Sequence, residues 1–164
     1  MQLKTMRHPL QCLLFCWLVT GLLPATAQAQ SAPPALVLQA STLDGEPFEL
    51  GKLKGKVVMV FYWSTQCAVC RSHLAELRAN LSGWRGKPFA LVTVNVDADK
   101  ADWRAYEHIV AQTHAVGPIA VWSGQTRAYK LPLTLVLDSQ GRVVARHEGR
   151  IAPEAWDAVA DMLL

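Results

Sequence analysis

Two cysteines separated by two residues, Cys67 and Cys70, are the residues best suited to do chemistry in this chain. They follow an unbroken apolar run, residues 57–63, and a short polar turn, residues 64–66. The apolar run is typical of a buried strand, and the apolar positions after the cysteines recur with the period of a helix. Two thiols at this spacing can form a disulfide with each other or attack a disulfide in another protein. The sequence therefore predicts redox chemistry at the junction of a strand and a helix.

The helix predicted after the polar turn begins near Cys67 and ends near Gly83, because glycine often follows the last turn of a helix. At a helix start, unsatisfied backbone N–H groups and the positive end of the dipole favour a thiolate over a thiol. We therefore expect Cys67 to be the exposed sulfur that attacks a substrate, and Cys70 to be the more buried sulfur that resolves the mixed disulfide. His73 is expected to be a solvated residue of this helix. The predicted apolar face consists of Cys70, Leu74, Leu77 and Leu81.

Residues 1–29 have the features of a secretory signal peptide. Lys4 and Arg7 give a basic start, residues 10–23 form an apolar run, and residues 25–29 offer small residues for cleavage. The run is shorter than the roughly 20 residues that span a membrane, so an uncleaved membrane anchor is the weaker alternative. We expect a leader over residues 1–29, a linker over 30–35 and one folded domain over 36–164 in an exported protein.

Loss of this leader would change both the charge and the cysteine count. The formal net charge is +3, and without the two basic residues of the leader it falls to about +1, so a nucleic-acid partner is not expected. Cys12 and Cys16 also lie in the leader, which leaves Cys67 and Cys70 as the cysteines of the expected domain. A disulfide-stapled scaffold carries several pairs with long loops between them. A lone close pair is better explained by catalysis or metal binding.

The rest of the domain alternates strand-like and helix-like segments. This order predicts an α/β fold with a central mixed sheet flanked by helices, with the dithiol at the first strand–helix junction. The Asp44-Gly45 pair predicts a hairpin near the start of the domain, and Asp99 or Asp102 is expected to cap the second helix. The predicted strands are residues 36–38, 57–63, 89–96, 133–137 and 142–147, and further helices are predicted over 123–129 and 153–164.

Four segments together make the chain resemble a known family. They are the Asp44-Gly45 hairpin followed by Gly55-Lys56, residues 62–70 (YWSTQCAVC), residues 129–132 (YKLP), and residues 135–138 (LVLD) with Gly141. This combination is similar to the thioredoxin-fold superfamily and, within it, to the TlpA/ResA group of exported thiol-disulfide oxidoreductases. The resemblance covers residues 35–164, nearly the whole expected domain.

The resemblance implies a thioredoxin-like fold with an N-terminal β-hairpin extension. It also implies a reductant of disulfides in periplasmic proteins that works through a mixed disulfide, uses no cofactor, and is recharged by a membrane thiol-disulfide electron carrier. Pro132 would follow a cis peptide bond and expose the backbone groups of Leu131 beside Cys67, where a client segment can pair with them. Trp63 and Gln66 are further candidates for substrate binding, although Trp63 fits the core equally well. No metal site is expected, and the protein is expected to be a monomer.

Three positions depart from the family pattern. Gln66 stands where the family has an aromatic residue before the first cysteine, and Ala68-Val69 lacks the proline common between the cysteines. Phe61 occupies the position at which thioredoxins carry a buried acid, six residues before the nucleophile. The sequence therefore offers no obvious base to deprotonate Cys70, and it leaves open the rate and the redox potential.

Other functions are open to the same two thiols. A disulfide oxidase or isomerase would use the same chemistry, although the absence of a histidine between the cysteines disfavours a strong oxidant. A zinc- or copper-binding chaperone would use the thiols as ligands. His108 and His114 are spaced like ligands, but at about 100° per residue they point roughly 120° apart on a helix. A peroxidase would need a Pro and a Thr at fixed offsets from its cysteine, and these are missing.

Overall fold

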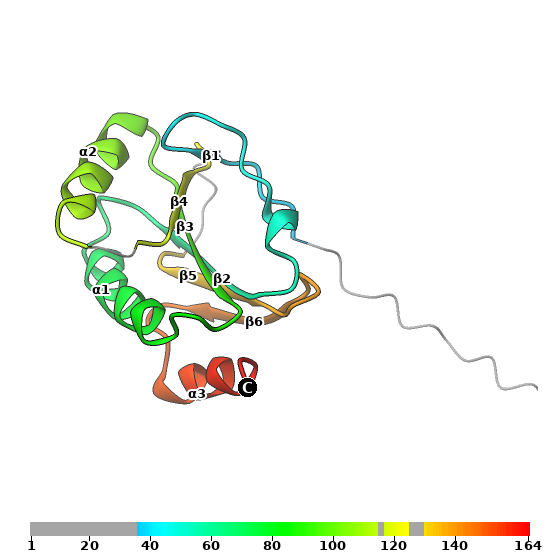
Figure 1. The fold of residues 1–164 in the computed structure, drawn as a ribbon. Helices are drawn as coiled ribbons and strands as arrows, with labels where there is room; N and C mark the ends of the chain where they lie inside the picture. Colours follow the sequence, from blue (N-terminus) through cyan, green and yellow to red (C-terminus); the bar gives the residue numbers. More distant parts are fainter. Residues whose placement is uncertain (1–35, 115–116, 125–129) are drawn as a thin grey trace, which may run out of the picture. The chain divides into compact units, whose positions relative to one another are not determined.

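The computed structural model describes residues 36–114, 117–124 and 130–164. In chain order, the elements of these residues are β1 (Ser41–Thr42), η1 (a 3₁₀ helix, Leu50–Leu53), β2 (Val57–Trp63), α1 (Ala68–Gly83), β3 (Phe89–Asn95), α2 (Lys100–Ala111), β4 (Ile119–Trp122), β5 (Leu133–Leu137), β6 (Val143–Glu148) and α3 (Pro153–Asp161) (Figure 1). The strands form one sheet in the order β1-β4-β3-β2-β5-β6. The pairs β2–β3 and β3–β4 are parallel, and the pairs β1–β4, β2–β5 and β5–β6 are antiparallel. The structure thus confirms the predicted central mixed sheet flanked by helices.

Strand β2 is buried on both faces, which is why its sequence is a continuous apolar run rather than an alternating one. The first of two core clusters in the described residues contains side chains from α1, α2 and α3, among them Leu74, Trp103 and Val159. The second cluster is covered by apolar side chains from the segment over residues 36–53. The residues of β2 alternate between these clusters: Val57, Met59, Phe61 and Trp63 belong to the first, and Val58, Val60 and Tyr62 to the second.

Capping by side chains explains where two helices begin. Cys67 is the N-cap of α1, with extended backbone, and its Sγ accepts a hydrogen bond from the backbone N–H of Cys70 at 3.1 Å. Asp99 is the N-cap of α2, and its Oδ1 accepts from the N–H of Ala101 at 2.8 Å. Pro153 lies in the first turn of α3, where its missing N–H is not needed. The predicted starts of α1, α2 and α3 are confirmed.

The hairpin predicted at Asp44-Gly45 is present as a short one. Gly45 has a φ of +92°, in the left-handed region that favours glycine, and its N–H donates to the carbonyl of Thr42 at 3.0 Å. The N–H of Thr42 in turn donates to the carbonyl of Glu46 at 2.9 Å. Strand β1, in the first arm, then pairs with β4 at the edge of the sheet.

Two other predictions, a strand over residues 36–38 and a helix over residues 123–129, have different outcomes. The strand predicted over residues 36–38 is wrong, because no strand forms there and Leu36 and Leu38 instead pack their side chains onto the sheet. The helix predicted to open at Ser123 falls mainly on residues 125–129, which lie outside the described residues. At the other end of the sheet, a turn at Gly141 joins β5 to β6, and the N–H of Gly141 donates to the carbonyl of Asp138 at 2.9 Å.

Candidate active site

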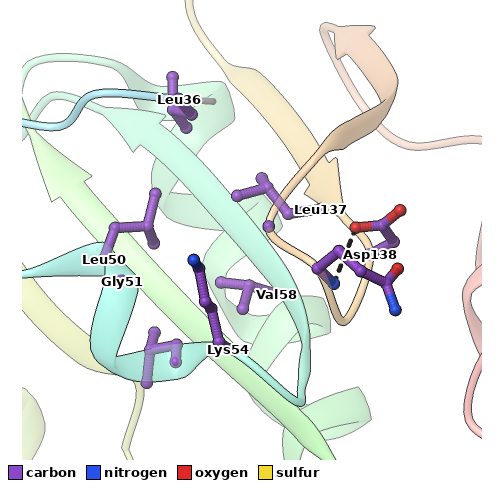
Figure 2. A pocket seen from close by; sticks show the side chains of 10 residues that line it. Leu36, Leu50, Gly51, Lys54, Val58, Leu137 and Asp138 are labelled. Carbon is purple, nitrogen blue, oxygen red and sulfur yellow. Dashed lines mark hydrogen bonds between the residues drawn. The ribbon is translucent and has the colours of Figure 1, made fainter. Parts of the chain in front are cut away.

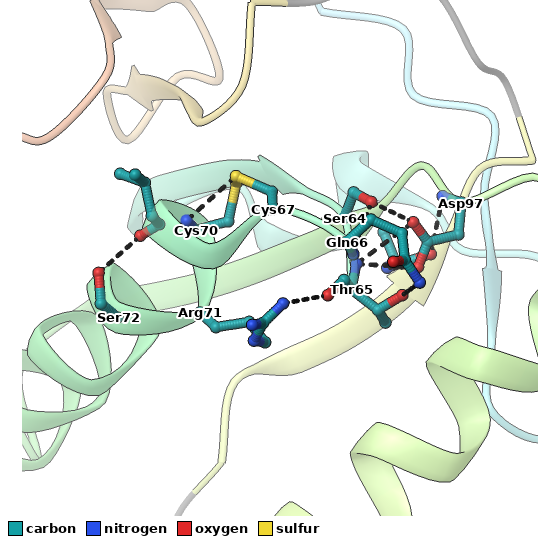
Figure 3. The surroundings of a disulfide bond; sticks show 10 residues. Ser64, Thr65, Gln66, Cys67, Cys70, Arg71, Ser72 and Asp97 are labelled. Carbon is teal, nitrogen blue, oxygen red and sulfur yellow. Dashed lines mark hydrogen bonds between the residues drawn. A yellow bond between two sulfur atoms is a disulfide. The ribbon is translucent and has the colours of Figure 1, made fainter.

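Cys67 and Cys70 form a disulfide bond at the start of α1 (Figure 3). Strand β2 ends at Trp63, the polar turn follows, and the helix begins after Cys67, so the dithiol lies at the strand–helix junction that the sequence predicts. The side chain of Cys70 is 0% exposed, whereas Cys67 is only half-buried. The exposure of the two sulfurs therefore agrees with the expectation that Cys67 is the accessible one.

The N-terminus of α1 provides the electrostatic setting of Cys67. The backbone N–H of Cys70 points at the Cys67 Sγ from 3.1 Å, and α1 runs without interruption to Gly83. Unpaired N–H groups and the positive end of the helix dipole stabilise a negative charge at this place. When the disulfide is reduced, the same N–H would favour the thiolate of Cys67, which is the nucleophilic form.

Asp97 ties the polar turn before Cys67 to the end of β3. Its carboxylate accepts hydrogen bonds from the hydroxyl of Ser64, from the N–H of Thr65 at 3.0 Å and from the side-chain amide of Asn95 at 2.9 Å (Figure 3). Burial raises the pKa of the Asp97 carboxyl, but these hydrogen bonds outweigh burial and hold its pKa below the usual value. Arg71 holds the turn from the other side, since its guanidinium donates to the carbonyl of Thr65. The sequence did not indicate this role of Asp97, because Ser64 lies 33 residues before it in the chain.

Replacing Asp97 with asparagine is expected to lower the free energy of unfolding by about 1–3 kcal/mol at neutral pH, because the turn loses a charged acceptor of several hydrogen bonds. The folded-state pKa of Asp97 lies below its unfolded value of about 3.9. Its contribution is therefore fully present above about pH 3.9 and is lost as the pH falls through the folded-state pKa. Urea unfolding should be measured at neutral pH and at several pH values below about 3.9. The difference in the free energy of unfolding between wild type and Asp97→Asn should become smaller as the pH falls.

Asp157→Asn is the matched control, because Asp157 is exposed on α3. Its substitution is expected to change the free energy of unfolding by less than about 0.5 kcal/mol, both at neutral pH and in acid. If Asp97→Asn lost no more free energy of unfolding than Asp157→Asn, or if its loss became larger in acid, Asp97 would not stabilise the turn as a carboxylate.

The peptide bond between Leu131 and Pro132 is cis, as predicted. Pro132 is buried and immediately precedes β5, whose first residue, Leu133, pairs with Tyr62 near the end of β2. The cis bond therefore lies near the C-terminal end of β2, where the polar turn leads from that strand to Cys67. Leu131 is half-buried and packs against the core.

The other two predicted substrate-binding residues lie in different environments. Gln66 is exposed next to Cys67, with its N–H donating to the Ser64 hydroxyl at 3.1 Å. Trp63 is 0% exposed, and its ring packs 4.7 Å from the ring of Tyr106, measured between centroids. Direct contact of Trp63 with a bound polypeptide is therefore excluded in this conformation, and its role is in the core beneath the turn.

His73 lies in a different environment from the one that its sequence position predicted. It was expected to be solvated, but its side chain is 0% exposed. Its Nδ1 lies 3.0 Å from Oε2 of Glu76, which also accepts from Arg150 at 3.1 Å, while Oε1 of Glu76 accepts from the indole of Trp156 at 2.7 Å. The available signal was its spacing, because a residue three positions after Cys70 lies on the same helix face.

Residues 36–114, 117–124 and 130–164 contain no group of three or more His, Cys, Asp or Glu residues placed to hold a metal ion. His108 and His114 are both exposed, and Nε2 of His108 lies 3.1 Å from the side-chain amide of Gln112. None of the helices in the described ranges is long and apolar enough to cross a membrane.

A separate apolar pocket lies away from the dithiol (Figure 2). Leu36, Leu50, Val58 and Leu137 line it, with Asp138 at one side, and Val58 and Leu137 belong to the second core cluster. The disulfide belongs to the opposite side of β2, since Cys70 is part of the first cluster. The pocket lining contains no thiol and no hydroxyl group, so the dithiol is the better candidate for an active site.

Comparisons with known proteins find a matching family and several similar proteins. Residues 29–154 match the AhpC/TSA family. The chain is 28% identical over 117 residues to the thiol-disulfide oxidoreductase ResA of Bacillus thuringiensis (strain Al Hakam), covering 68% of this chain and 66% of that protein. It is 24% identical over 126 residues to sporulation thiol-disulfide oxidoreductase A of Bacillus subtilis (strain 168), covering 76% and 66%. The chain thus spans 66% of the length of these curated relatives.

A solved structure supports the fold independently. The thioredoxin domain of a thiol-disulfide oxidoreductase from Bacteroides vulgatus superposes with a TM-score of 0.63 at 20% identity, covering 82% of this chain and 96% of that one. The predicted thioredoxin-like fold and the predicted resemblance to the ResA group are therefore confirmed. Because the matched region includes both cysteines and all six strands of the described sheet, the chain belongs to the AhpC/TSA family and has the thioredoxin-like fold.

Proposed function

We propose that this protein is an exported thiol-disulfide oxidoreductase that reduces disulfide bonds in periplasmic proteins. The observation that carries the proposal is the Cys67–Cys70 disulfide at the N-terminus of α1, with one sulfur accessible and the other buried. The relatives named thiol-disulfide oxidoreductases support the same class of reaction. Disulfide-containing client proteins are the substrates in this proposal.

The reaction starts from the reduced dithiol. The thiolate of Cys67 attacks one sulfur of a client disulfide, so that a mixed disulfide forms and the other client sulfur leaves as a thiolate and takes up a proton. Cys70 then loses its proton and attacks the Sγ of Cys67, which releases the second client sulfur. The client gains two electrons and two protons, and the dithiol loses them to become the Cys67–Cys70 disulfide. Backbone groups of Leu131 and the side chain of Gln66 contact the client segment in this scheme.

The direction and the location of the reaction are part of the proposal. The residues between the cysteines are Ala68 and Val69, neither of which adds a positive charge that would stabilise the thiolate further, as in a strong oxidant. A membrane thiol-disulfide electron carrier would return the protein to the dithiol form. Residues 1–29 act as the export leader and residues 30–35 as a linker to a monomeric domain.

Replacing Cys70 with serine is expected to stop the reaction at the mixed disulfide, because no second thiol can displace Cys67. Client proteins should then accumulate as covalent complexes with the variant, detectable on non-reducing gels and identified by mass spectrometry after reduction. The control is Cys67→Ser, which should trap none of them because the remaining sulfur is buried.

The redox potential tests the direction. Equilibration of the dithiol against a glutathione series is expected to give a potential well below about −120 mV, the value of the strongest oxidants of this class. A potential near that value would reject the reductant. Stoichiometric binding of zinc or copper(I) without reduction of insulin disulfides would favour a metal chaperone instead.

A further inference from the structure

His73 lies on the buried face of α1, and one nitrogen of its imidazole has no hydrogen-bond partner. His73 is 0% exposed, and its Nε2 has no hydrogen-bond partner, although its Nδ1 is paired with Glu76 at 3.0 Å. A buried polar atom without a partner is costly and uncommon in native structures. The unpartnered nitrogen therefore calls for a role that the resting disulfide does not reveal.

The chemistry of the Glu76 contact fixes which nitrogen of the neutral ring carries the proton. An ionised carboxylate can only accept hydrogen bonds, so Nδ1 of His73 donates its proton to Glu76. In the neutral imidazole, Nε2 then has a free lone pair and is a proton acceptor. His73 is thus held in the tautomer that a general base requires.

His73, which carries this lone pair, lies on the same face of α1 as Cys70. Residues three apart on a helix have Cβ atoms about 5–6 Å apart and lie on the same face, and helix side chains lean toward the N-terminus. His73 therefore leans over the turn that contains Cys70, and both side chains are 0% exposed. The ring of Phe61 lies 5.6 Å from the His73 ring, and Phe61 belongs to the same core cluster as Cys70. His73 and Cys70 thus share one buried face of α1 beside Phe61, whose ring contributes no polar group there.

The charged groups around His73 allow it to hold a proton only transiently. Burial lowers the pKa of the imidazole below its ordinary value, the carboxylate of Glu76 opposes this shift, and Arg150 adds slightly to it. From α3, the uncharged indole of Trp156 donates to Glu76, and from β2 the ring of Phe61 is apolar. At neutral pH the ring is therefore uncharged and able to accept a proton, and Glu76 stabilises the imidazolium once it forms.

We propose that His73 is the general base that takes the proton of Cys70 when Cys70 resolves the mixed disulfide, with Glu76 as its positioning residue. This inference rests on the proposed function, because it assigns a role within the same dithiol reaction. In this proposal His73 supplies the base for Cys70 that the sequence did not reveal.

The step balances in protons and electrons. The Cys70 S–H bond breaks and its proton moves to Nε2 of His73, giving an imidazolium paired with Glu76. The Cys70 thiolate then attacks the Sγ of Cys67, the Cys67–Cys70 bond forms, and the bond between Cys67 and the client breaks. The client sulfur leaves with the electron pair of that bond and is protonated, and His73 returns its proton to solvent. In the opposite direction, the imidazolium protonates the Cys70 thiolate as it leaves.

The rival explanation is purely mechanical. Glu76 accepts hydrogen bonds from Trp156 and Arg150, and these contacts join α1 to α3 and to the chain before it. His73 could then serve only to hold Glu76 in place. That explanation predicts an effect of His73 on stability, but none on the separate chemical steps of the two cysteines.

The aromatic disulfide reagent 5,5′-dithiobis(2-nitrobenzoate) separates these steps without a client protein. Its reaction with the reduced protein releases one thiolate when Cys67 attacks and a second when Cys70 displaces the mixed disulfide. For His73→Gln at neutral pH, stopped-flow absorbance is expected to show the second phase slowed about 100-fold and the first phase changed less than about twofold. The second phase of the variant should also keep rising with pH until Cys70 ionises by itself.

The matched control is His108→Gln, which removes an exposed histidine from α2 and should change neither phase. An unchanged second phase in His73→Gln, or equal slowing of both phases, would overturn the proposal. The reagent is not a physiological client, so a failure of the reductant hypothesis would leave this measurement unaffected.

A second measurement uses the wild-type protein and does not depend on the folding of a variant. NMR titration of the His73 imidazole is expected to give a higher pKa in the dithiol form than in the disulfide form, because only the dithiol form can place a thiolate charge at Cys70. A His73 pKa that is the same in both redox forms would overturn the proposal.

Discussion

Cys67→Ser is expected to reduce disulfide exchange to the uncatalysed level, a loss on the order of 10⁶-fold if it matches the loss of other catalytic nucleophiles. A serine hydroxyl is not ionised at neutral pH and does not attack disulfides, and the remaining thiol of Cys70 is 0% exposed. The rate of insulin reduction and the first phase of the aromatic disulfide reagent should both fall to background. Either rate measured within tenfold of wild type would show that Cys67 is not the nucleophile.

The fold of Cys67→Ser should be unaffected, which makes the loss of activity specific to chemistry. The Sγ of Cys67 accepts a hydrogen bond from the N–H of Cys70 at the N-cap of α1. Serine is among the preferred N-cap residues and offers an oxygen for the same N–H. Under reducing conditions, where the wild-type disulfide is open, the two proteins should unfold at urea concentrations that agree within error.

Trp103→Ala is expected to lower the free energy of unfolding by about 3–5 kcal/mol. The Trp103 side chain is 0% exposed and belongs to the core cluster that also contains Trp63 and Cys70. Its removal leaves a cavity between α2 and the sheet that the neighbouring side chains fill only in part. Since small domains are stable by only about 5–15 kcal/mol, the loss should appear in urea unfolding as a large fall of the midpoint.

Ile109→Ala on the same helix is the control for this change. Ile109 is 63% exposed, so its truncation removes little buried surface and should cost less than about 0.5 kcal/mol beyond the change in helix propensity. If Trp103→Ala were no more destabilising than Ile109→Ala, the packing of α2 against the first core cluster would be wrong.

The residues around the dithiol could be predicted because their signals are local. The continuous apolar run of β2 indicates a strand buried on both faces, and the helical spacing after Cys67 indicates α1. Asp99 and Pro153 mark helix starts through their own side chains. Each of these features depends on residues within a few positions of each other, so no knowledge of the fold is needed to find it.

The environments of Trp63, which the sequence left open, and of His73, which it misplaced, depend on contacts between distant parts of the chain. Trp63 could have pointed toward a substrate or the core, and only the packing of α2 against the end of β2 puts it in the core beside Tyr106. His73 has a polar side chain at a helix position, for which solvent is the usual environment. Its burial follows from α3, which closes over that face of α1.

By itself, the sequence determined the strand, the turn, the helix and the exposed and buried positions of the two cysteines, since these follow from periodicity and capping. The tertiary structure alone decided what surrounds them. Asp97 holds Ser64 from 33 residues away, and Glu76 is held by Arg150 and Trp156 from 74 and 80 residues away. Hydrogen bonds over such separations leave no periodic signal in a sequence, because they form only after the sheet has brought its strand ends and helices together.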